Sequence, residues 1–133
     1  ILLRMPDGVE LLLDDCEELE METDRNRLTQ ILTNLLTNAI KHTREGFIRF
    51  GYKKTDGFVE FFIQDSGEGI PEDKVDSIFS RFVQLDDWSK GVGLGLAICK
   101  GLVGQMQGKI WATSKLGEGS VFFVRLPLTV NII

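Results

Sequence analysis

The 133-residue sequence has few of the residues that build metal-held or covalently linked folds: it contains one histidine, two cysteines and three prolines. Cys16, Cys99 and His42 have no recognised metal-ligand spacing, and two cysteines make no disulfide framework, so we expect both thiols to be reduced and buried. The longest apolar runs are also far too short to span a bilayer. These absences argue against a disulfide-linked scaffold, a zinc-organised domain and a membrane-spanning segment.

An excess of positive charge is missing as well. The chain carries 15 Lys and Arg against 20 Asp and Glu, which gives a net charge of −5. This balance argues against a general nucleic-acid binder, although it leaves room for a local basic pocket for one small anion. A hydrophobic share of 43% is ordinary for a globular protein, and the length predicts a single domain over 1–133. Because the chain begins at Ile1 without an initiator methionine, we expect it to be a fragment of a larger chain.

The sequence does contain an alternation of strand and helix patterns. A strongly periodic apolar segment follows a predicted N-cap at Asp24, and Gly46 is expected to end that helix. Asp56-Gly57 is the strongest short hairpin signal. The predicted order is a strand at 9–15, the helix, a hairpin of 47–54 and 58–65, a short helix to about Phe82, an ill-defined segment at 83–91, a helix within 91–105, and strands at 109–114 and 120–128. This order predicts an α+β fold, a two-layer α/β sandwich whose mixed, mostly antiparallel sheet of about five strands is backed by about three helices.

The stretch "NLLTNAIKHT" at 34–43 carries polar residues beside the apolar helix face. At about 100° per residue, Asn34, Asn38 and Lys41 fall within roughly 60° of one another. Two amide oxygens and an ammonium would then point into the same space, where amide oxygens suit Mg²⁺ and a lysine suits a phosphate. A solvated helix flank with routine asparagines explains the same pattern.

The stretch "DSGEGI" at 65–70 follows an apolar strand directly. Gly67 and Gly69 allow a close approach or a positive φ, and the Asp65 carboxylate could accept a hydrogen bond from an exocyclic amine. The same pattern is also a common way for a strand to enter a turn.

A second glycine-rich stretch, "GVGLGLAICK" at 91–100, leads into a helix. The free N–H groups at a helix N-terminus and the helix dipole favour a phosphate there. The stretch matches neither the P-loop nor the dinucleotide fingerprint, so it is weak evidence alone.

In this order, the three patterns resemble the nucleotide-binding domain of sensor histidine kinases, within the ATPase superfamily shared with gyrase B, the MutL proteins and the ninety-kilodalton heat-shock chaperone. "DRNRLTQILTNLLTNAIKHT" is similar to the asparagine box, "DSGEGI" to the first glycine box, "IFSRFVQ" to the phenylalanine box, "GVGLGLAICK" to the second glycine box and "GEGSVFFVRLP" to the closing turn and strand. Five motifs in the right order and spacing cover nearly the whole chain, which makes the resemblance specific.

The resemblance implies a site for ATP and Mg²⁺. Asn38 would coordinate the magnesium, with Asn34 as a second or water-mediated ligand. Lys41 would reach a phosphate, His42 would pack near the adenine or ribose, and Asp65 would accept from the adenine amino group. The other implied nucleotide-binding residues are Gly67, Gly69 and Ile70 around the base, Phe79 and Phe82 at the start of a mobile ATP lid of about residues 83–92, Arg81, Gln84 and Lys90 near the phosphates or lid, and Gly91, Gly93, Leu94, Gly95 and Leu96 in the second glycine box.

One position points to phosphoryl transfer over hydrolysis. In the hydrolysing relatives, a glutamate one helical turn before the magnesium asparagine acts as general base for water. Here that position is Asn34, and an amide cannot take a proton at neutral pH. Water activation should therefore be poor, which leaves positioning and charge neutralisation, the main resources in phosphoryl transfer.

The resemblance further implies a protein-histidine kinase catalytic domain. It would donate the γ-phosphoryl group of Mg-ATP to a histidine on a separate dimerisation domain of the same protein, and so start a phosphorelay to a response regulator. His42 is followed by Thr43 and lies inside the asparagine box, so it is not the expected acceptor, and the fragment should bind ATP without autophosphorylating. We expect a cytoplasmic domain without direct membrane or nucleic-acid contact, in a homodimeric, membrane-anchored bacterial sensor.

Two other functions stay open at the level of sequence. A serine-directed kinase of the same superfamily, of the anti-sigma type, would lack the dimerisation hairpin. A degenerate module that has lost ATP would serve only as a docking surface, and the intact asparagine and glycine boxes argue against it.

Overall fold

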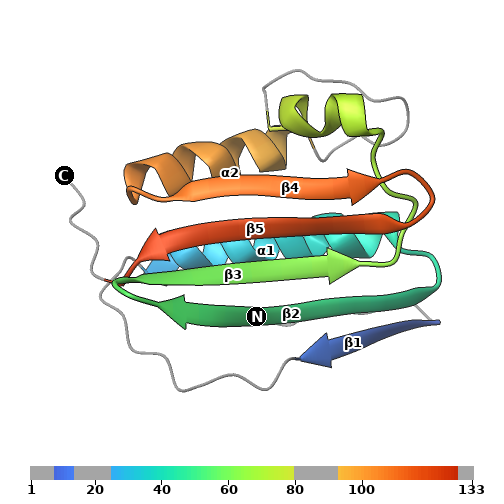
Figure 1. Cartoon of the computed structure of the whole chain (residues 1–133), viewed down its shortest axis with the longest axis horizontal. Helices are drawn as coiled ribbons and strands as arrows, with labels where there is room; N and C mark the ends of the chain where they lie inside the picture. The colour runs from blue at the N-terminus through green and yellow to red at the C-terminus, as the bar shows by residue number, and fades with distance from the viewer. Residues whose placement is uncertain (1–7, 14–24, 80–92, 129–133) are drawn as a thin grey trace.

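The protein forms an α/β sandwich with a single five-stranded sheet, seen in a computed structural model that describes residues 8–13, 25–79 and 93–128 (Figure 1). The strand order is β1-β2-β3-β5-β4. The strands are β1 (Val9–Leu13), β2 (Gly46–Thr55), β3 (Phe58–Asp65), β4 (Lys109–Lys115) and β5 (Gly119–Pro127). β1 and β2 are parallel and the other neighbours are antiparallel, so the predicted α+β fold with a mixed, mostly antiparallel sheet is confirmed.

Two α-helices, α1 (Arg25–His42) and α2 (Gly93–Gln105), lie side by side on one face of the sheet (Figure 1). Apolar residues recur every three or four positions in α1, and its buried members Ile31, Leu35 and Ala39 face the core. The Cys99 thiol of α2 lies 3.6 Å from the Ile31 carbonyl oxygen of α1, which marks a close contact between the two helices.

Strand β3 shows how the sheet directs its side chains. Its buried residues alternate along the strand, and Val59, Phe61 and Ile63 point into the core under the helices. Asp65 has the same parity, so the strand also directs its carboxylate to the helix side, where it is only 4% exposed. The sheet therefore places one carboxylate at the end of the core.

Several predicted boundaries shift. α1 ends at His42, and Gly46 is the first residue of β2 with φ of 114°, so Gly46 as a helix end is wrong. The short helix is a 3-10 helix, η1 (Glu72–Ser77), and the last residues of the predicted stretch, 80–82, lie outside the described residues. The hairpin turn at Asp56-Gly57 is confirmed, with φ of 74° at Gly57. The predicted N-cap Asp24 lies outside the described residues.

Candidate functional site

The last turns of α1 place Asn38 inside the molecule. Asn38 is 3% exposed, and among the described residues its Oδ1 atom has no hydrogen-bond partner. A solvated helix flank is therefore wrong for Asn38, since the asparagine stripe turns further into the core than its helical spacing suggests. A buried carbonyl oxygen without a partner is costly, by about 1–3 kcal/mol. An amide oxygen is also the type of hard ligand that Mg²⁺ prefers.

Asn34 lies one helical turn earlier, at the contact between α1 and α2. Burial raises the pKa of the Cys99 thiol to about 11, and a hydrogen bond from the side chain of Asn34 partly opposes that rise. Cys99 is a buried free thiol, as predicted, whereas Cys16 lies outside the described residues. Asn34 is thus half-buried against Cys99 of α2, which lies near the end of the second glycine box.

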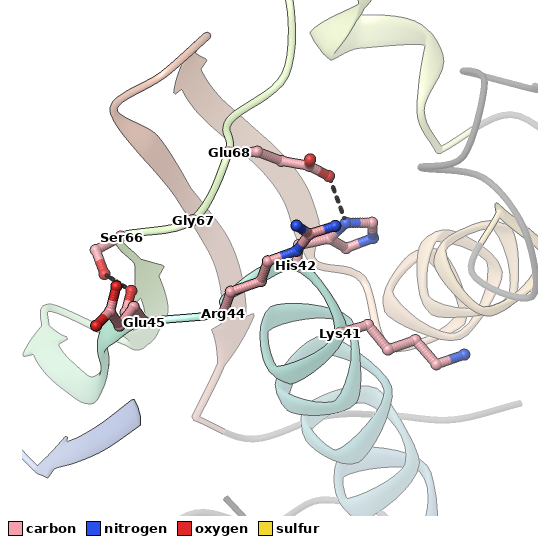
Figure 2. Close-up of a pocket in the computed structure, with 7 residues that line it drawn as sticks. All are labelled: Lys41, His42, Arg44, Glu45, Ser66, Gly67 and Glu68. Atoms are coloured by element: carbon pink, nitrogen blue, oxygen red, sulfur yellow. Dashed lines mark hydrogen bonds and ion pairs between the residues drawn. The ribbon is translucent and has the colours of Figure 1, made fainter. Parts of the chain in front are cut away.

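Lys41 and His42 end α1 beside the loop that follows β3. His42 Nδ1 lies 3.0 Å from Glu68 Oε1, and the two side chains are 11% and 60% exposed. A pocket of about 420 Å³ opens here, as Figure 2 shows, and Lys41 extends away from the His42–Glu68 pair. The pocket is lined by Lys41, His42, Arg44, Glu45, Ser66, Gly67 and Glu68. It combines three basic or ring-nitrogen side chains with two carboxylates.

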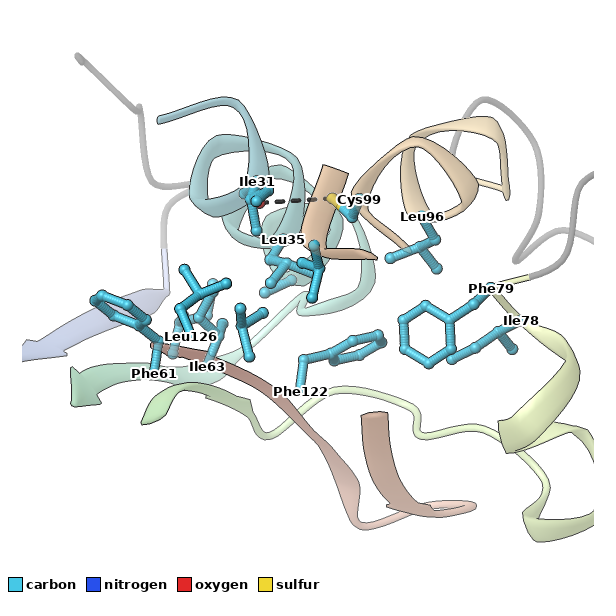
Figure 3. Close-up of a cluster of buried hydrophobic side chains, with 14 of the residues drawn as sticks. Ile31, Leu35, Phe61, Ile63, Ile78, Phe79, Leu96, Cys99, Phe122 and Leu126 are labelled. Carbon is cyan, nitrogen blue, oxygen red and sulfur yellow. Dashed lines mark hydrogen bonds between the residues drawn. The ribbon is translucent and has the colours of Figure 1, made fainter. Parts of the chain in front are cut away.

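Three of the predicted nucleotide-site residues, Ile70, Phe79 and Leu96, are core residues here. They are 1%, 6% and 1% exposed. Phe79 meets Phe122 of β5 edge to face, with ring centroids 5.9 Å apart (Figure 3). Their side chains pack the layer beneath the site, and Phe79 ties the segment after η1 to the sheet.

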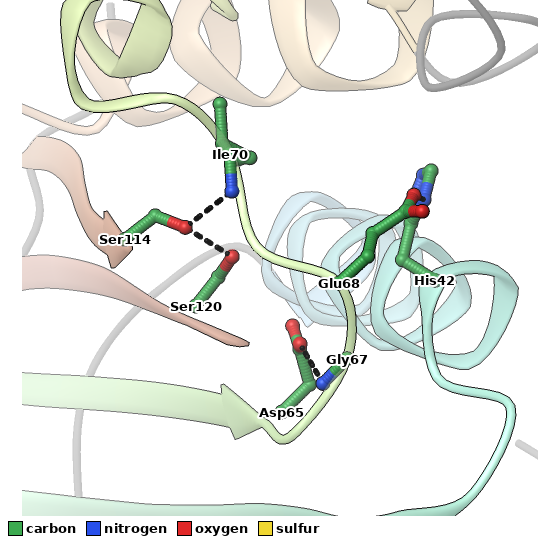
Figure 4. Close-up of polar contacts among 7 residues, drawn as sticks. All are labelled: His42, Asp65, Gly67, Glu68, Ile70, Ser114 and Ser120. Carbon is green, nitrogen blue, oxygen red and sulfur yellow. Dashed lines mark hydrogen bonds and ion pairs between the residues drawn. The ribbon is translucent and has the colours of Figure 1, made fainter. Parts of the chain in front are cut away.

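Asp65 is held at the end of β3. Its Oδ1 accepts a hydrogen bond from the Gly67 backbone N–H at 2.9 Å (Figure 4). Burial raises the pKa of Asp65 from 3.8 to about 6, backbone hydrogen bonds from Gly67 and Ser120 oppose the rise, and the nearby Glu68 adds to it. At neutral pH the carboxylate is ionised although burial disfavours its charge, so a hydrogen-bond donor from a ligand would stabilise it.

The glycines around Asp65 allow the backbone to pack closely. A Cβ on Gly67 would lie 2.1 Å from the His42 carbonyl oxygen, and one on Gly119 would lie 2.1 Å from the Asp65 carbonyl oxygen. Gly69 has φ of 75°, and its Cβ would meet the Lys115 carbonyl oxygen at 2.2 Å. The loop after β3 is therefore clamped between the end of α1 and the β4–β5 turn.

Two serines hold that loop from the opposite side. Ser114 Oγ accepts from the Ile70 backbone N–H at 2.7 Å, donates to the Gly119 carbonyl at 2.9 Å and lies 2.8 Å from Ser120 Oγ (Figure 4). Ser120 faces Asp65 across the β3–β5 ladder. The strand pairing thus fixes the loop and the carboxylate together.

The remaining predicted residues divide into two groups. Gly93, Leu94 and Gly95 form the first turn of α2, where backbone N–H groups have no partner within the helix. The predicted residues outside the described part of the chain are Arg81, Phe82, Gln84, Lys90 and Gly91, together with the predicted lid.

Comparison with known families decides the assignment. The family described as "Histidine kinase-, DNA gyrase B-, and HSP90-like ATPase" matches residues 23–130. The chain belongs to this family. It is an ATPase domain of the histidine-kinase type, as the relatives below indicate.

The curated relatives of this ATPase domain are kinases. The "Adaptive-response sensory kinase SasA" of Synechococcus elongatus is 40% identical over 109 residues, which cover 79% of the chain and 28% of that protein. The "Sensor protein kinase WalK" of Staphylococcus haemolyticus is 40% identical over 121 residues, which cover 86% of the chain and 20% of that protein. The chain therefore spans about a quarter or less of the length of such relatives.

The fold is also similar to solved structures of proteins that are more than 30% identical to the chain. Full-length ShkA in complex with AMPPNP has a TM-score of 0.83 and 34% identity, covering 95% of the chain and 27% of ShkA. The catalytic domain of histidine kinase ThkA has a TM-score of 0.77 and 35% identity, covering 92% of the chain and 79% of that structure. Among the described residues, no helix of this ATPase domain combines the length and apolar character needed to cross a membrane.

Sequence reasoning missed Glu68, Ser114 and Ser120 as parts of the site. Glu68 occupies a position between two glycines, where nothing in the local sequence indicates a partner on α1. The serines lie in strands that read only as sheet, and they reach the site because β5 lies between β3 and β4. Only knowledge of the strand order could have found them.

Proposed function

We propose that this ATPase domain binds Mg-ATP and donates the γ-phosphoryl group to a histidine on a separate dimerisation domain of the same longer protein. The observation that carries the proposal is Asn38: a buried amide oxygen without a partner among the described residues, on the helix that also ends in Lys41 and His42. Natural folds rarely leave such an atom orphaned, and a bound cation would satisfy it.

The residues fit a magnesium ion in one respect. Magnesium prefers hard oxygen ligands and is usually held by one or two protein oxygens together with phosphates and water. Asn38 Oδ1 would be the protein ligand, and Asn34 would assist through water. When bound, the ion would neutralise phosphate charge. Among the described residues, no group of three or more His, Cys, Asp or Glu could form a separate protein-only metal site, which is consistent with an ion held mainly by the nucleotide.

The residues also fit adenine. Asp65 is buried, and its surroundings disfavour the ionised carboxylate. A hydrogen bond donated by an exocyclic amino group would therefore stabilise this carboxylate. His42 would pack against the base or the ribose. Lys41 is exposed, so its ammonium group could reach a phosphate. The first-turn N–H groups of α2 would meet the phosphates. The structure of ShkA with AMPPNP supports nucleotide binding by a relative of this fold.

The chemistry of the domain would be transfer to protein, because Asn34 offers no base to activate water. We infer that the acceptor histidine lies on a dimerisation domain outside this chain and that the phosphoryl group passes on to a response regulator. The longer protein would be a homodimeric, membrane-anchored bacterial sensor whose kinase domain is cytoplasmic. This proposal rests on the relatives being sensor kinases of which the chain spans only a part.

Two measurements test the proposal. Titration calorimetry with AMPPNP and Mg²⁺ should show binding to the 133-residue chain, and absence of binding at millimolar nucleotide would contradict it in favour of a docking module. In the full-length protein, radiolabelled γ-phosphate should then be found on a histidine. Phosphohistidine is labile in acid and stable in base, so the label should be lost in acid and retained in base. Label that survives acid would identify a serine-directed kinase instead.

A further inference from the structure

The face of the sheet opposite the helices carries an aromatic surface. Alternation along the strands places Phe62 of β3, Phe123 of β5 and Trp111 of β4 on that side, and none of them belongs to the hydrophobic cluster under the helices. Each is half-buried. Figure 1 is viewed from this side, with α1 passing behind β3 and β5. Large aromatic side chains on a sheet face that none of the described helices covers are an unusual use of apolar groups.

The strand register lines these residues up in a row. Phe62 is opposite Phe123, and Phe123 is opposite Trp111, so three aromatic rings cross three neighbouring strands. The Trp111 and Phe123 rings are stacked at 5.2 Å with an interplanar angle of 14°. Gly51 continues the row on β2 without a side chain. The row therefore has no projecting side chain on β2. We call the outward residues of β2, β3, β5 and β4 the outer aromatic face.

Cationic side chains border this row. On one side the register places Lys53, Glu60, Arg125 and Lys109 next to one another, and Arg49 lies on the other side. On these four strands there are five outward cationic residues against one acidic residue, Glu60; Lys115 pairs with Glu118 at 3.6 Å, and Glu10 of β1 lies beside Phe47 on the same side of the sheet. The cationic residues, all exposed, are Arg49, Lys53, Lys109, Lys115 and Arg125.

A hollow of about 260 Å³ opens beside the aromatic row. Its lining includes Gln64, Thr113 and Val121, which form the next row of outward residues along the sheet, and also the acidic residues Asp65 and Glu118. The hollow gives the surface a depression next to a ridge of aromatic rings. Because this lining is largely polar, apolar contact with a partner would fall on the aromatic row itself and not in the hollow.

We propose that the outer aromatic face is a docking surface for an acidic protein segment, one that presents carboxylates around an apolar centre. Trp, Tyr and Arg are the residue types that contribute most of the binding energy at protein interfaces, and this face carries Trp111, Arg49 and Arg125. The cationic border would pair with the carboxylates and steer their approach. Because the chain as a whole is negatively charged, an acidic partner would be attracted to this positive face and repelled by the rest of the surface.

Two other occupants are disfavoured by the same contacts. A second copy of this face would bring two cationic borders together, which repel. A single-stranded nucleic acid needs exposed ring faces for its bases, but Trp111 and Phe123 stack on each other and the Arg125 guanidinium covers the Phe58 ring at 4.3 Å.

The test is an NMR titration of the ¹⁵N-labelled 133-residue chain with three probes: an amphipathic peptide of leucine and glutamate, the same peptide with lysine for glutamate, and oligo-dT. We expect the acidic peptide to shift the Trp111 indole and the outward amides of β3, β4 and β5. We also expect its affinity to exceed that of the lysine peptide by about ten-fold. The affinity of the acidic peptide should decrease when the NaCl concentration is raised from about 50 to about 500 mM.

The variant Lys109→Glu should weaken the acidic peptide about five-fold. Lys100→Glu, an exposed lysine on α2 in the other layer, is the matched control and should bind like the wild type. Tighter binding of oligo-dT, shifts confined to the helix side, no binding of the acidic peptide, or self-association in sedimentation would each overturn the proposal. Nucleotide affinity of Lys109→Glu should equal that of the wild type, so failure here is separate from failure of Mg-ATP binding.

Discussion

His42 Nδ1 lies 3.0 Å from Glu68 Oε1, and this contact joins the end of α1 to the loop after β3. The two residues are 26 positions apart, and the same loop bonds through the Glu68 carbonyl to the Gly117 N–H at 2.7 Å. Three segments distant in sequence therefore converge on Glu68. The contact fixes the His42 ring at the wall of the pocket in Figure 2.

The first prediction concerns this contact. Glu68→Ala should lower nucleotide affinity a few-fold, because His42 loses the partner that orients its ring, while the free energy of unfolding should fall by less than about 1 kcal/mol, since Glu68 is exposed. Calorimetry and urea denaturation measure the two effects. Glu118→Ala, which breaks the exposed pair with Lys115, is the control and should leave nucleotide affinity unchanged. Equal effects of both variants would remove Glu68 from the site.

A second prediction follows from the raised pKa of Asp65. Because that pKa rises from 3.8 to about 6 on folding, the native state binds more protons than the unfolded state between these values. Wild-type stability should therefore fall as pH rises through this window and stay lower above it. Asp65→Asn removes the buried charge, so it should be more stable than the wild type by about 1–3 kcal/mol above pH 6 and equal below pH 3.8.

The same variant should bind ATP more weakly by about 1–2 kcal/mol, because a charge-assisted hydrogen bond to adenine becomes a neutral one. Urea denaturation at several pH values, with calorimetry at neutral pH, gives both quantities. A stabilised variant with wild-type affinity would show that Asp65 does not contact the nucleotide.

A third prediction compares two glycines. Gly67→Ala should destabilise the domain by about 1–3 kcal/mol, because the new Cβ would lie 2.1 Å from the His42 carbonyl oxygen and the loop must shift. Gly101→Ala lies in α2 with nothing within 4 Å, so it should stabilise by about 0.5–1 kcal/mol. Chemical denaturation of both variants tests the difference in sign, and the same sign for both would contradict the close packing around Gly67.

Much of the fold follows from local sequence. The apolar spacing of α1 and the Asp56-Gly57 turn depend on neighbours within a few positions, and both are predicted correctly. The strand order depends on contacts between distant segments, so the approach of Ser114 and Ser120 to Asp65 has no local signature. Helical spacing places Asn38 beside the apolar face, but it cannot tell how far neighbouring segments cover that flank, and the residue is in fact buried.

The most direct measurement is the effect of Mg²⁺ on the affinity of the chain for AMPPNP, compared between the wild type and Asn38→Ala. If Asn38 Oδ1 holds the ion, Mg²⁺ should raise wild-type affinity about ten-fold, and the variant should lose that gain while keeping its affinity in EDTA. Asn26→Ala, an exposed asparagine on the same helix, should behave like the wild type. A folded Asn38→Ala variant that keeps the full Mg²⁺ gain would contradict the assignment of Asn38 as the magnesium ligand.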